Sequence, residues 1–385
     1  MTEELPVVVV GTGLAGYALV RELRKHAPDQ RVLMITADDG ASYSKPMLST
    51  GFTKDKDADG LAQASAEAMA EQLNVEIRPY TAVTAIDADA HELRIGQERV
   101  RYSRLVLAWG ADVVRLDLDG DGLDRVFSIN DLMDYRTFRE ALAGARHVAI
   151  MGAGLIGCEF ANDLRNGGYD VSVIAPDHTV MPGLLPKPAA DAVQTALAGL
   201  GVAFYPGTVV QRVDRQGDAV RLTLADSQTL EADLVISAVG LQPRVALARA
   251  AGADTARGIV VSRALETSLP DVYALGDCAE VDGHLLPYVM PLMACARALA
   301  RTLTGERTEV RYGVMPVMVK TPCCPTAVYP PPAQASGEWQ VTQDGQDVKA
   351  VFRSPKGETL GFAVTGRYAM EKQQLARDVP PVHSL

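Results

Sequence analysis

Continuous apolar runs and amphipathic stretches follow one another in the first part of the chain. The β-branched run Val7–Val10 precedes a glycine-rich turn, Gly11–Gly16, then an amphipathic stretch from Tyr17 to His26 and a second apolar run, Arg31–Thr36. Apolar runs of this length are typical of parallel strands buried on both faces, and the amphipathic stretch has helical spacing. The pattern predicts a strand–helix–strand unit.

An approximate repeat of this pattern begins at His147. The apolar run His147–Met151 precedes the turn Gly152–Gly157, a helix is expected through Leu164, and another run covers Asp170–Ala175. Each glycine turn has the form G-x-G-x-x-G between a strand and a helix, which is the context of a dinucleotide-binding fingerprint. The two units predict an α/β fold with two Rossmann-like dinucleotide-binding domains.

Later segments of the chain differ from this repeat. Two apolar runs, Leu105–Ala108 and Leu234–Gly240, close the two units and are expected to be strands near domain crossings. The stretch from Thr321 to Pro332 holds five prolines in twelve residues, so we expect no regular sheet structure there.

The tail beyond this stretch has a different pattern. Turn residues at Asp344-Gly345 and Pro355–Gly357 separate short β-rich runs, and a helix is expected from Arg367 to Arg377. We predict a small C-terminal α+β domain with an antiparallel sheet. The expected division, with the second dinucleotide-binding domain inserted into the first, is 1–112, 113–238, 239–314 and 315–385.

Composition narrows the classes of function. The net charge of −11 argues against general affinity for nucleic acid or an anionic membrane surface. Neither a signal peptide nor an uncharged apolar stretch of about 18 residues is readable, so we expect a cytoplasmic protein without a membrane span. Five cysteines without a Cys-x-x-Cys pair are expected to be free thiols, and no metal site is expected.

The glycine spacing has a physical reason. The first glycine permits the tight turn, the second lets the backbone approach a pyrophosphate, and the third lets helix and strand pack closely. The pyrophosphate then meets unpaired N–H groups at the helix N-terminus. A bare strand-to-helix turn is the alternative for either copy, but two copies in matching context favour two bound dinucleotides.

The two units differ where an acid usually binds a ribose hydroxyl. Asp38 and Asp39 follow the second strand of the first unit. In the second unit the strand runs into Ala175-Pro176-Asp177, so the expected acid is absent or displaced. No Arg or Lys follows that could hold a 2′-phosphate, although His178 could contribute, and we expect NADH rather than NADPH to be the donor.

The order of blocks along the chain resembles the flavoprotein reductases related to glutathione reductase. After the first fingerprint come Leu105-Val106-Leu107-Ala108 with Gly110-Ala111, the second fingerprint, Ser237–Pro243 and Gly276-Asp277, so the resemblance covers residues 5 to about 300. It implies non-covalent FAD in the first domain and NADH as co-substrate in the second. The residues implied to bind FAD are Gly11, Gly13, Leu14, Ala15, Gly16, Gly276 and Asp277, and those implied to bind NADH are Gly152, Gly154, Ile156, Gly157 and Gly240.

Three further blocks, Tyr43–Gly51, Leu155–Phe160 and Tyr288–Met293, resemble the rubredoxin–NAD reductases within that group. This resemblance implies electron transfer from NADH through FAD to rubredoxin, with alkane degradation as its setting. It also implies that Lys45 and Glu159 form a catalytic ion pair beside flavin N5. The further residues implied to touch FAD are Thr36, Ala37, Lys45, Pro46, Val83, Glu159, Val289 and Lys320.

The positions of the cysteines exclude one branch of the resemblance. Disulfide reductases of this group carry a Cys-x4-Cys pair in the first domain, whereas the first cysteine here is Cys158. Related peroxide reductases carry a cysteine after Leu-Ser, where this chain has Thr50. A hydroxyl cannot supply a thiolate, so a direct route from flavin to acceptor is expected.

Other acceptors and roles stay open from sequence. A reductase for a [2Fe–2S] ferredoxin, a general diaphorase, and a non-catalytic NADH-sensing flavoprotein are the alternatives. An acidic rubredoxin would need a local basic surface on this acidic chain, and Arg297, Arg301 and Lys320 are candidates for it.

Overall fold

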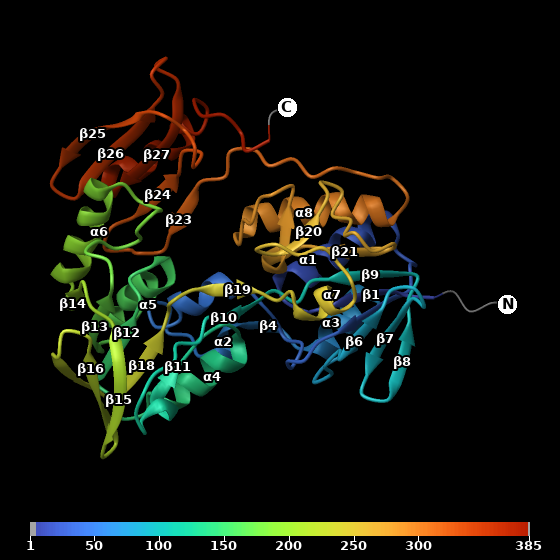
Figure 1. Cartoon of the computed structure of the whole chain (residues 1–385), viewed down its shortest axis with the longest axis horizontal. Coiled ribbons are helices and arrows are strands. Elements are labelled where there is room, and N and C mark those ends of the chain that lie inside the picture. The colour runs from blue at the N-terminus through green and yellow to red at the C-terminus, as the bar shows by residue number, and fades with distance from the viewer. Residues whose placement is uncertain (1–4, 384–385) are drawn as a thin grey trace. The chain divides into compact units, whose positions relative to one another are not determined.

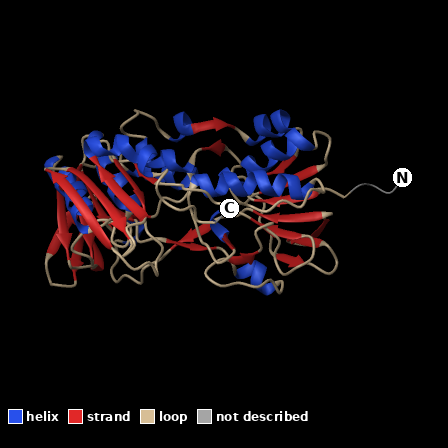
Figure 2. Cartoon of the chain, turned by 90° about the horizontal axis from the view of Figure 1, so that it is seen from above, coloured by secondary structure: helices blue, strands red, loops and turns tan. Residues whose placement is uncertain are grey.

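The computed structural model describes residues 5–383 and divides the chain into two compact units. Unit 1 consists of 1–45, 62–112 and 241–312, and unit 2 consists of 46–61, 113–240 and 313–385. Helices and strands occur in both units (Figures 1 and 2). The α/β fold class with an additional C-terminal α+β part is confirmed.

A five-stranded parallel sheet organises unit 1. Its strand order is β21-β9-β1-β2-β5, and β1 (Val7–Val10) lies beside β2 and β9. The side chains of β1 are all buried, as a parallel strand with a continuous apolar run requires. Helices α1 (Leu14–His26) and α8 (Val289–Leu303) pack against each other. The other strands of the sheet are β2 (Val32–Ile35), β5 (Glu76–Arg78), β9 (Arg104–Leu107) and β21 (Val272–Ala274).

Smaller elements complete unit 1. An antiparallel meander is formed by β6 (Ala85–Asp87), β7 (Glu92–Ile95) and β8 (Glu98–Arg101). Two short pairs join β3 (Ser42–Tyr43) to β4 (Ala62–Ala64) and β20 (Ile259–Val261) to β22 (Ala279–Val281). The remaining helices are α3 (Ala66–Leu73), α7 (Ala246–Ala250) and the 3-10 turn η3 (Gly276–Cys278).

Unit 2 contains the second parallel sheet, with the order β11-β18-β12-β13-β14. Its strands are β11 (Val126–Phe127), β12 (His147–Met151), β13 (Asp170–Ala175), β14 (Val202–Pro206) and β18 (Leu234–Ser237). The main helices are α4 (Leu132–Ala141), α5 (Leu155–Asn166) and α6 (Lys187–Gly199), with the short α2 (Ala58–Leu61), η1 (Lys45–Thr50) and η2 (Leu123–Arg125). An antiparallel sheet of β15 (Val210–Gln216), β16 (Ala219–Leu224) and β17 (Thr229–Ala232) adds its own apolar cluster.

The C-terminal part of unit 2 is an antiparallel sheet, as predicted. Its order is β23-β24-β27-β26-β25, and helix α6 packs against β26 and β27 beneath it (Figure 1). The hairpin turns fall at Asp344–Asp347 and Ser354–Glu358. The strands are β23 (Val317–Val319), β24 (Thr326–Tyr329), β25 (Glu338–Asp344), β26 (Asp347–Arg353) and β27 (Thr359–Thr365), followed by η4 (Gly366–Glu371) and α9 (Lys372–Leu375).

The prediction for the proline-rich stretch was wrong. Strand β24 lies inside it and pairs with β23 on one side and β27 on the other. Its four residues contain no proline, since Pro325 and Pro330 stand immediately outside both ends, so every N–H that the ladder needs is available. The proline content of the whole stretch does not reveal that these four residues are free of proline.

Three boundaries between the two units lie close to the domain boundaries predicted from the sequence. The changes occur after Asp112, Gly240 and Tyr312, and the short strands β10 (Ala111–Val113) and β19 (Leu241–Pro243) pair with each other where the chain crosses. Residues 46–61 also belong to unit 2, although the segments on both sides of them belong to unit 1. The sequence did not indicate this assignment. The four-part domain division stays a prediction.

Candidate dinucleotide sites and the buried network beside them

The three glycines of the first fingerprint have different surroundings. Gly11 has φ +113°, and a Cβ atom there would lie 2.3 Å from the Ala108 carbonyl oxygen. A Cβ atom at Gly16 would lie 2.0 Å from the Gly11 carbonyl oxygen, whereas one at Gly13 would meet nothing within 4 Å. Packing therefore requires the first and third glycines, while the second leaves open space in front of the backbone.

Helix α1 begins at this open space. Gly13 is its N-cap residue and makes no side-chain cap hydrogen bond, and the first turn holds no acidic residue. The first N–H groups of a helix lack partners within the helix, and the helix dipole favours negative charge there. The geometry fits the pyrophosphate of a dinucleotide at the N-terminus of α1.

The carboxylate of Asp38 connects the end of β2 to this turn. Its Oδ1 atom accepts hydrogen bonds from Thr36 Oγ1 at 2.6 Å, from Gly40 N at 3.0 Å and from Thr12 Oγ1 at 3.2 Å. Asp38 therefore fixes the fingerprint threonine and places an acid at the strand end, where a ribose is bound in such domains. Asp39 instead accepts from the backbone N–H of Ala41, which closes a local turn.

Gly276 and Asp277 lie next to the first fingerprint although they are far from it in sequence. A Cβ atom at Gly276 would lie 2.9 Å from Ala15 Cβ and 3.7 Å from Leu292 Cδ1. The structure thus brings η3, the first turn of α1 and the first turn of α8 together within unit 1. Helix α8 also begins without a side-chain cap, and Val289, its first residue, is exposed.

The second fingerprint has the same geometry in unit 2. Gly152 has φ +105° and its Cβ atom would lie 2.5 Å from the Ala238 carbonyl oxygen. A Cβ atom at Gly157 would lie 2.0 Å from the Gly152 carbonyl oxygen, and one at Gly154 would meet nothing within 4 Å. Gly154 caps α5 without a side-chain hydrogen bond, as Gly13 caps α1. The geometry of this turn therefore fits a second pyrophosphate in the same way.

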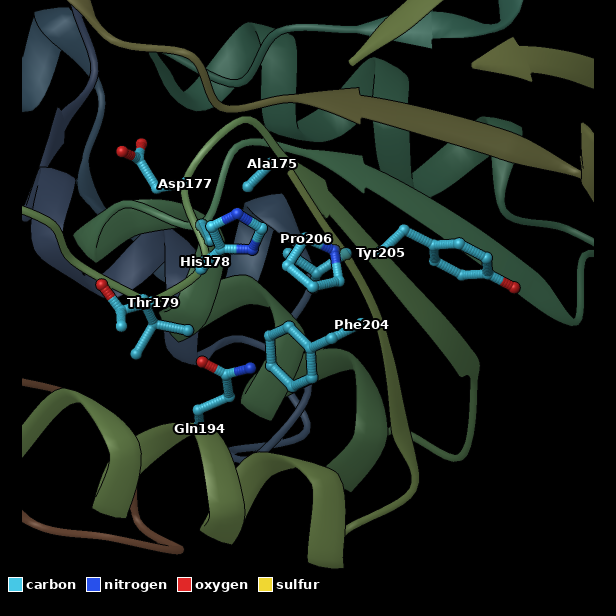
Figure 3. A pocket seen from close by; sticks show the side chains of 11 residues that line it. Ala175, Asp177, His178, Thr179, Gln194, Phe204, Tyr205 and Pro206 are labelled. Atoms are coloured by element: carbon cyan, nitrogen blue, oxygen red, sulfur yellow. The ribbon is translucent and has the colours of Figure 1, made fainter. Parts of the chain in front are cut away.

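A shallow pocket lies beside this second fingerprint, at the carboxyl end of β13. Figure 3 shows it between the loop after β13, which carries Asp177, His178 and Thr179, and side chains of α6 and β14. The loop is tied to the fingerprint by a 2.7 Å hydrogen bond from Met181 N to Ala153 O. The lining residues are Ala153, Val173, Ala175, Asp177, His178, Thr179, Val180, Gln194, Phe204, Tyr205 and Pro206.

Comparison with known proteins agrees with this pair of sites. Residues 5–300 match the family described as pyridine nucleotide-disulphide oxidoreductase. The chain belongs to this family. Residues 309–379, which contain the C-terminal antiparallel sheet, match a second family described as rubredoxin binding C-terminal domain.

Individual relatives agree over almost the whole length. The chain is 51% identical over 378 residues to a rubredoxin-NAD(+) reductase of Alcanivorax borkumensis, covering 98% of this chain and 99% of the relative. It is 46% identical over 388 residues to a protein of the same name from Acinetobacter baylyi, with the same coverage. Among solved structures, a ferredoxin reductase from Rhodopseudomonas palustris superposes with a TM-score of 0.87 at 25% identity, covering 97% of this chain and 95% of that one.

In this member of the pyridine nucleotide-disulphide oxidoreductase family, Glu159 lies two residues beyond the second fingerprint and is completely buried. Its carboxylate accepts hydrogen bonds from Ser49 Oγ at 2.8 Å and from the backbone N–H of Lys320 at 2.9 Å, and it pairs with the Lys320 ammonium group. All three residues belong to unit 2. A buried carboxylate needs such partners, because an unpaired charge away from water is strongly unfavourable.

Two more polar residues on the same face of α5 extend this network. Asp163 accepts hydrogen bonds from Phe52 N at 3.1 Å and Thr53 N at 2.7 Å, and Asn162 Oδ1 accepts from Cys323 N at 3.2 Å. Helix α5 is therefore hydrogen-bonded both to the segment 46–61 and to the segment that leads to β24. Sequence reasoning missed Asn162 and Asp163, although their spacing of three and four residues from Glu159 places them on one helix face.

Glu159 and Lys320 were both predicted as site residues, but their direct contact was not predicted. The expected partner of Glu159, Lys45, belongs to unit 1. The Lys45–Glu159 pair therefore stays a prediction. The ammonium group of Lys320 pairs with buried Glu159, and its contribution to a basic docking surface stays a prediction. Of the other two candidates, Arg301 pairs with Glu306 at 3.3 Å and Arg297 is exposed.

The remaining predicted residues lie in the two units as follows. Thr36 is buried at the end of β2, Ala37 beside it is exposed, and Val83 is half-buried in the segment before β6. Lys45 and Pro46, both half-buried, stand where the chain passes from unit 1 to unit 2. In unit 2, Ile156 is an exposed apolar residue in the first turn of α5, and Gly240 O accepts from Val114 N at 3.0 Å.

The five cysteines are free thiols, and four of them are buried. Burial raises the pKa of both Cys158 and Cys278 to about 12, and the pKa of Cys295 and of Cys323 to about 11. The pKa of Cys324 is also raised by burial. Thiols with raised pKa values are poor nucleophiles near neutral pH, because the reactive species is the thiolate.

Residues 5–383 contain neither a candidate membrane-spanning helix nor a cluster of possible metal ligands. None of the helices there is long and apolar enough to cross a bilayer. Within the same range, no three side chains of His, Cys, Asp or Glu are grouped so that they could hold a metal ion.

Proposed function

We propose that this chain is an FAD-dependent NADH:rubredoxin oxidoreductase. The observation that carries the proposal is the presence of two glycine-rich turns with matching geometry in a chain whose C-terminal part matches a rubredoxin-binding domain. The names of the relatives from Alcanivorax and Acinetobacter support the same activity. FAD supplies the chemistry that accepts a two-electron hydride and releases single electrons.

The residues of unit 1 fit the FAD that this function needs. The open space at Gly13 and the uncapped start of α1 would hold its pyrophosphate, and Asp38 would meet its adenosine ribose. Gly276 and Asp277 lie beside Ala15, where Asp277 would bind the ribityl chain. Thr36, Ala37 and Val83 would contact the adenine end, and Val289 would place the positive end of α8 at the flavin.

The residues of unit 2 would bind NADH. Gly152 and Gly157 shape the turn, Gly154 leaves room for the pyrophosphate, and the exposed side chain of Ile156 would contact the nucleotide. Gly240, at the crossing after β18, would approach the nicotinamide half. Because no Lys or Arg lines the pocket after β13, we propose NADH rather than NADPH as the donor.

We propose that Lys45 and Glu159 act at the reacting face. The Lys45 ammonium group would stabilise negative charge that develops there, and Glu159 would orient it and meet the nicotinamide side. Glu159 has Lys320 and Ser49 as partners in unit 2, so its position is fixed independently of Lys45. Neither residue would carry the hydride.

The acceptor would be reduced without an internal thiol. The high pKa values of the buried cysteines and the threonine at position 50 support a direct route. Free thiols also support a cytoplasmic location, where glutathione and thioredoxin keep cysteines reduced. A [2Fe–2S] ferredoxin is the second candidate acceptor, favoured by the likeness to the Rhodopseudomonas ferredoxin reductase.

Two measurements test the proposal. Purified protein is expected to be yellow, to release FAD on denaturation, and to lose its flavin absorbance when NADH is added without oxygen. It is also expected to transfer electrons from NADH to rubredoxin in steady state. A folded protein that binds no flavin, or one that NADH bleaches but that reduces no rubredoxin, would contradict the corresponding part.

A further inference from the structure

The segment 46–61 takes its position from contacts with the rest of unit 2. It follows Lys45, which ends the first stretch of unit 1, and its α-helix, α2, has four residues and packs against α4 (Figure 1). A segment this short has too little apolar surface to fold on its own. Because the turn η1 begins at Lys45 and continues to Thr50, the place of this segment also determines where the Lys45 backbone lies.

Three side chains of α5, spaced by four and three residues, contact this segment from one face of the helix. Ser49 Oγ donates to the Glu159 carboxylate at 2.8 Å, and Asn166 Nδ2 donates to Thr53 Oγ1 at 2.9 Å. Asp163 lies between Glu159 and Asn166 in the sequence of the helix. The helix thus holds the segment at two places that are four residues apart.

Asp163 holds the backbone of the segment rather than a side chain. It is 2% exposed, and its two carboxylate oxygens accept hydrogen bonds from consecutive N–H groups, Phe52 N at 3.1 Å and Thr53 N at 2.7 Å. Neighbouring N–H groups that point toward one acceptor form an anion-binding turn. Buried backbone donors need acceptors and a buried carboxylate needs donors, so loss of either partner leaves the other without its hydrogen bonds.

The side chain of Phe52 is anchored at the end of the same helix. A Cβ atom at Gly167 would lie 3.0 Å from Phe52 Cβ, so the glycine gives the phenyl group its place. The ring meets Tyr169 edge-on with centroids 5.4 Å apart, and the Arg139 guanidinium carbon lies 4.2 Å from its centroid. Without the carboxylate of Asp163 the ring would keep these contacts, and the loss would be confined to the backbone of the segment.

We propose that Asp163 is a positioning residue for flavin reduction. By holding the N–H groups of Phe52 and Thr53 on α5, it fixes the segment and, through η1, the residue Lys45 with which that turn begins. Helix α5 also begins in the second fingerprint, so the helix that would bind the NADH pyrophosphate is the one that fixes this segment. The inference rests on the proposed action of Lys45 at the flavin, and not on the identity of the electron acceptor.

The test compares Asp163→Asn with Asp218→Asn in the FAD-loaded full-length protein. Asparagine keeps the size of the side chain, but it has one acceptor oxygen and its NH2 group would face the second N–H. Asp218 is an exposed acid in the turn between β15 and β16, so its replacement removes the same charge away from α5. In rapid mixing, the rate constant of flavin reduction at saturating NADH is expected to fall about fivefold in Asp163→Asn, with the Kd for NADH unchanged. Both constants are expected to equal those of the wild type in Asp218→Asn.

A double-mutant cycle with Lys45→Met separates the positioning of Lys45 from a general loss of structure. If Asp163 acts through Lys45, Asp163→Asn is expected to change the rate constant in the Lys45→Met background by less than about 1.5-fold. Asn166→Ala removes an exposed contact from the same face of α5. It is expected to slow flavin reduction about twofold, and this loss is also expected to disappear in the Lys45→Met background.

The possible failures can be told apart. A wild-type rate in Asp163→Asn, or an equal fold loss with and without Lys45, would overturn the positioning role of Asp163. If Asp163→Asn does not fold, the cycle of Asn166→Ala with Lys45→Met decides by the same criteria. A wild-type rate in Lys45→Met itself would overturn the proposed action of Lys45 and this inference with it, whereas wild-type protein that NADH does not bleach would overturn the proposed function.

Discussion

The two glycines Gly154 and Gly157 stand three residues apart in one turn, yet their replacement by alanine is expected to have different consequences. Gly154→Ala is expected to weaken NADH binding, whereas Gly157→Ala is expected to destabilise the fold. Gly154 has extended backbone angles that alanine also adopts, and its Cβ atom would meet nothing within 4 Å. Alanine is a poorer N-cap residue than glycine, which costs about 0.5–1 kcal/mol. Gly154→Ala should therefore fold, but its methyl group occupies the space that the pyrophosphate needs.

At Gly157 the added methyl group meets backbone. Its Cβ atom would lie 2.0 Å from the Gly152 carbonyl oxygen, and real Cβ contacts essentially never fall below 3.0 Å, so α5 and the turn must separate by about 1 Å. Overpacking of a rigid site typically lowers stability by about 1–3 kcal/mol. The cost for this variant is expected at the upper end of that range, because the clashing atom belongs to the backbone and cannot rotate away. We expect the free energy of unfolding of Gly157→Ala to fall by about 2–3 kcal/mol.

Urea unfolding and steady-state kinetics distinguish the two effects. Gly154→Ala is expected to keep nearly wild-type stability and full FAD content, and to raise KM for NADH by about tenfold or more. The matched variant Gly13→Ala, at the equivalent position of the first fingerprint, should instead lose FAD. The reasoning is refuted if Gly154→Ala binds NADH as the wild type does, or if it loses as much stability as Gly157→Ala.

Other predictions concern single groups. Lys45→Met is expected to slow flavin reduction by NADH about tenfold with FAD retained, and Glu159→Gln to slow it less, as rapid mixing would show; wild-type rates in both would refute their role. Lys320→Met leaves a buried carboxylate without its cation and should lower the free energy of unfolding by about 3–5 kcal/mol, measured in urea. Burial alone would raise the pKa of Glu280, but the Gly258 N–H and the Arg257 guanidinium outweigh it and hold that pKa below its usual range. This stabilisation is present above the unfolded pKa and is lost as pH falls through the folded one, so Glu280→Gln should be less stable than wild type at pH 7 but not at about pH 3. Replacing all five cysteines by serine should leave NADH-to-rubredoxin rates within about twofold of wild type on FAD-loaded protein, and loss of transfer with normal flavin reduction would contradict the direct route.

The elements that the sequence predicted well are those marked by a pattern within a few neighbouring residues. The strands His147–Met151 and Asp170–Ala175 agree with the structure in their bounds, because continuous apolar runs in parallel sheets have abrupt polar ends. Helix α1 begins at Leu14 rather than Tyr17, since the helix starts inside the fingerprint itself. The expected helix after β27 is a 3-10 turn followed by one short α-helix, a distinction that side-chain spacing does not reveal.

The buried network could not be predicted in the same way. Glu159 and Lys320 are 161 residues apart, and Glu159 and Ser49 are 110 apart, so their contacts depend on how α5, η1 and the segment before β24 pack together. A glutamate in a helix and a lysine before a proline-rich stretch are normally exposed residues. The family resemblance indicated that both belong to the site, whereas their mutual contact comes only from tertiary structure.

The choice of acceptor is the most direct test of the central claim. Under anaerobic conditions, with one concentration of FAD-loaded enzyme and saturating NADH, the initial rates of reduction of rubredoxin and of a [2Fe–2S] ferredoxin are compared over a range of acceptor concentrations. We predict a higher kcat/KM for rubredoxin by about tenfold or more, since the C-terminal sheet belongs to a domain family that binds it. Equal or faster reduction of the ferredoxin would contradict the assignment of rubredoxin as the acceptor.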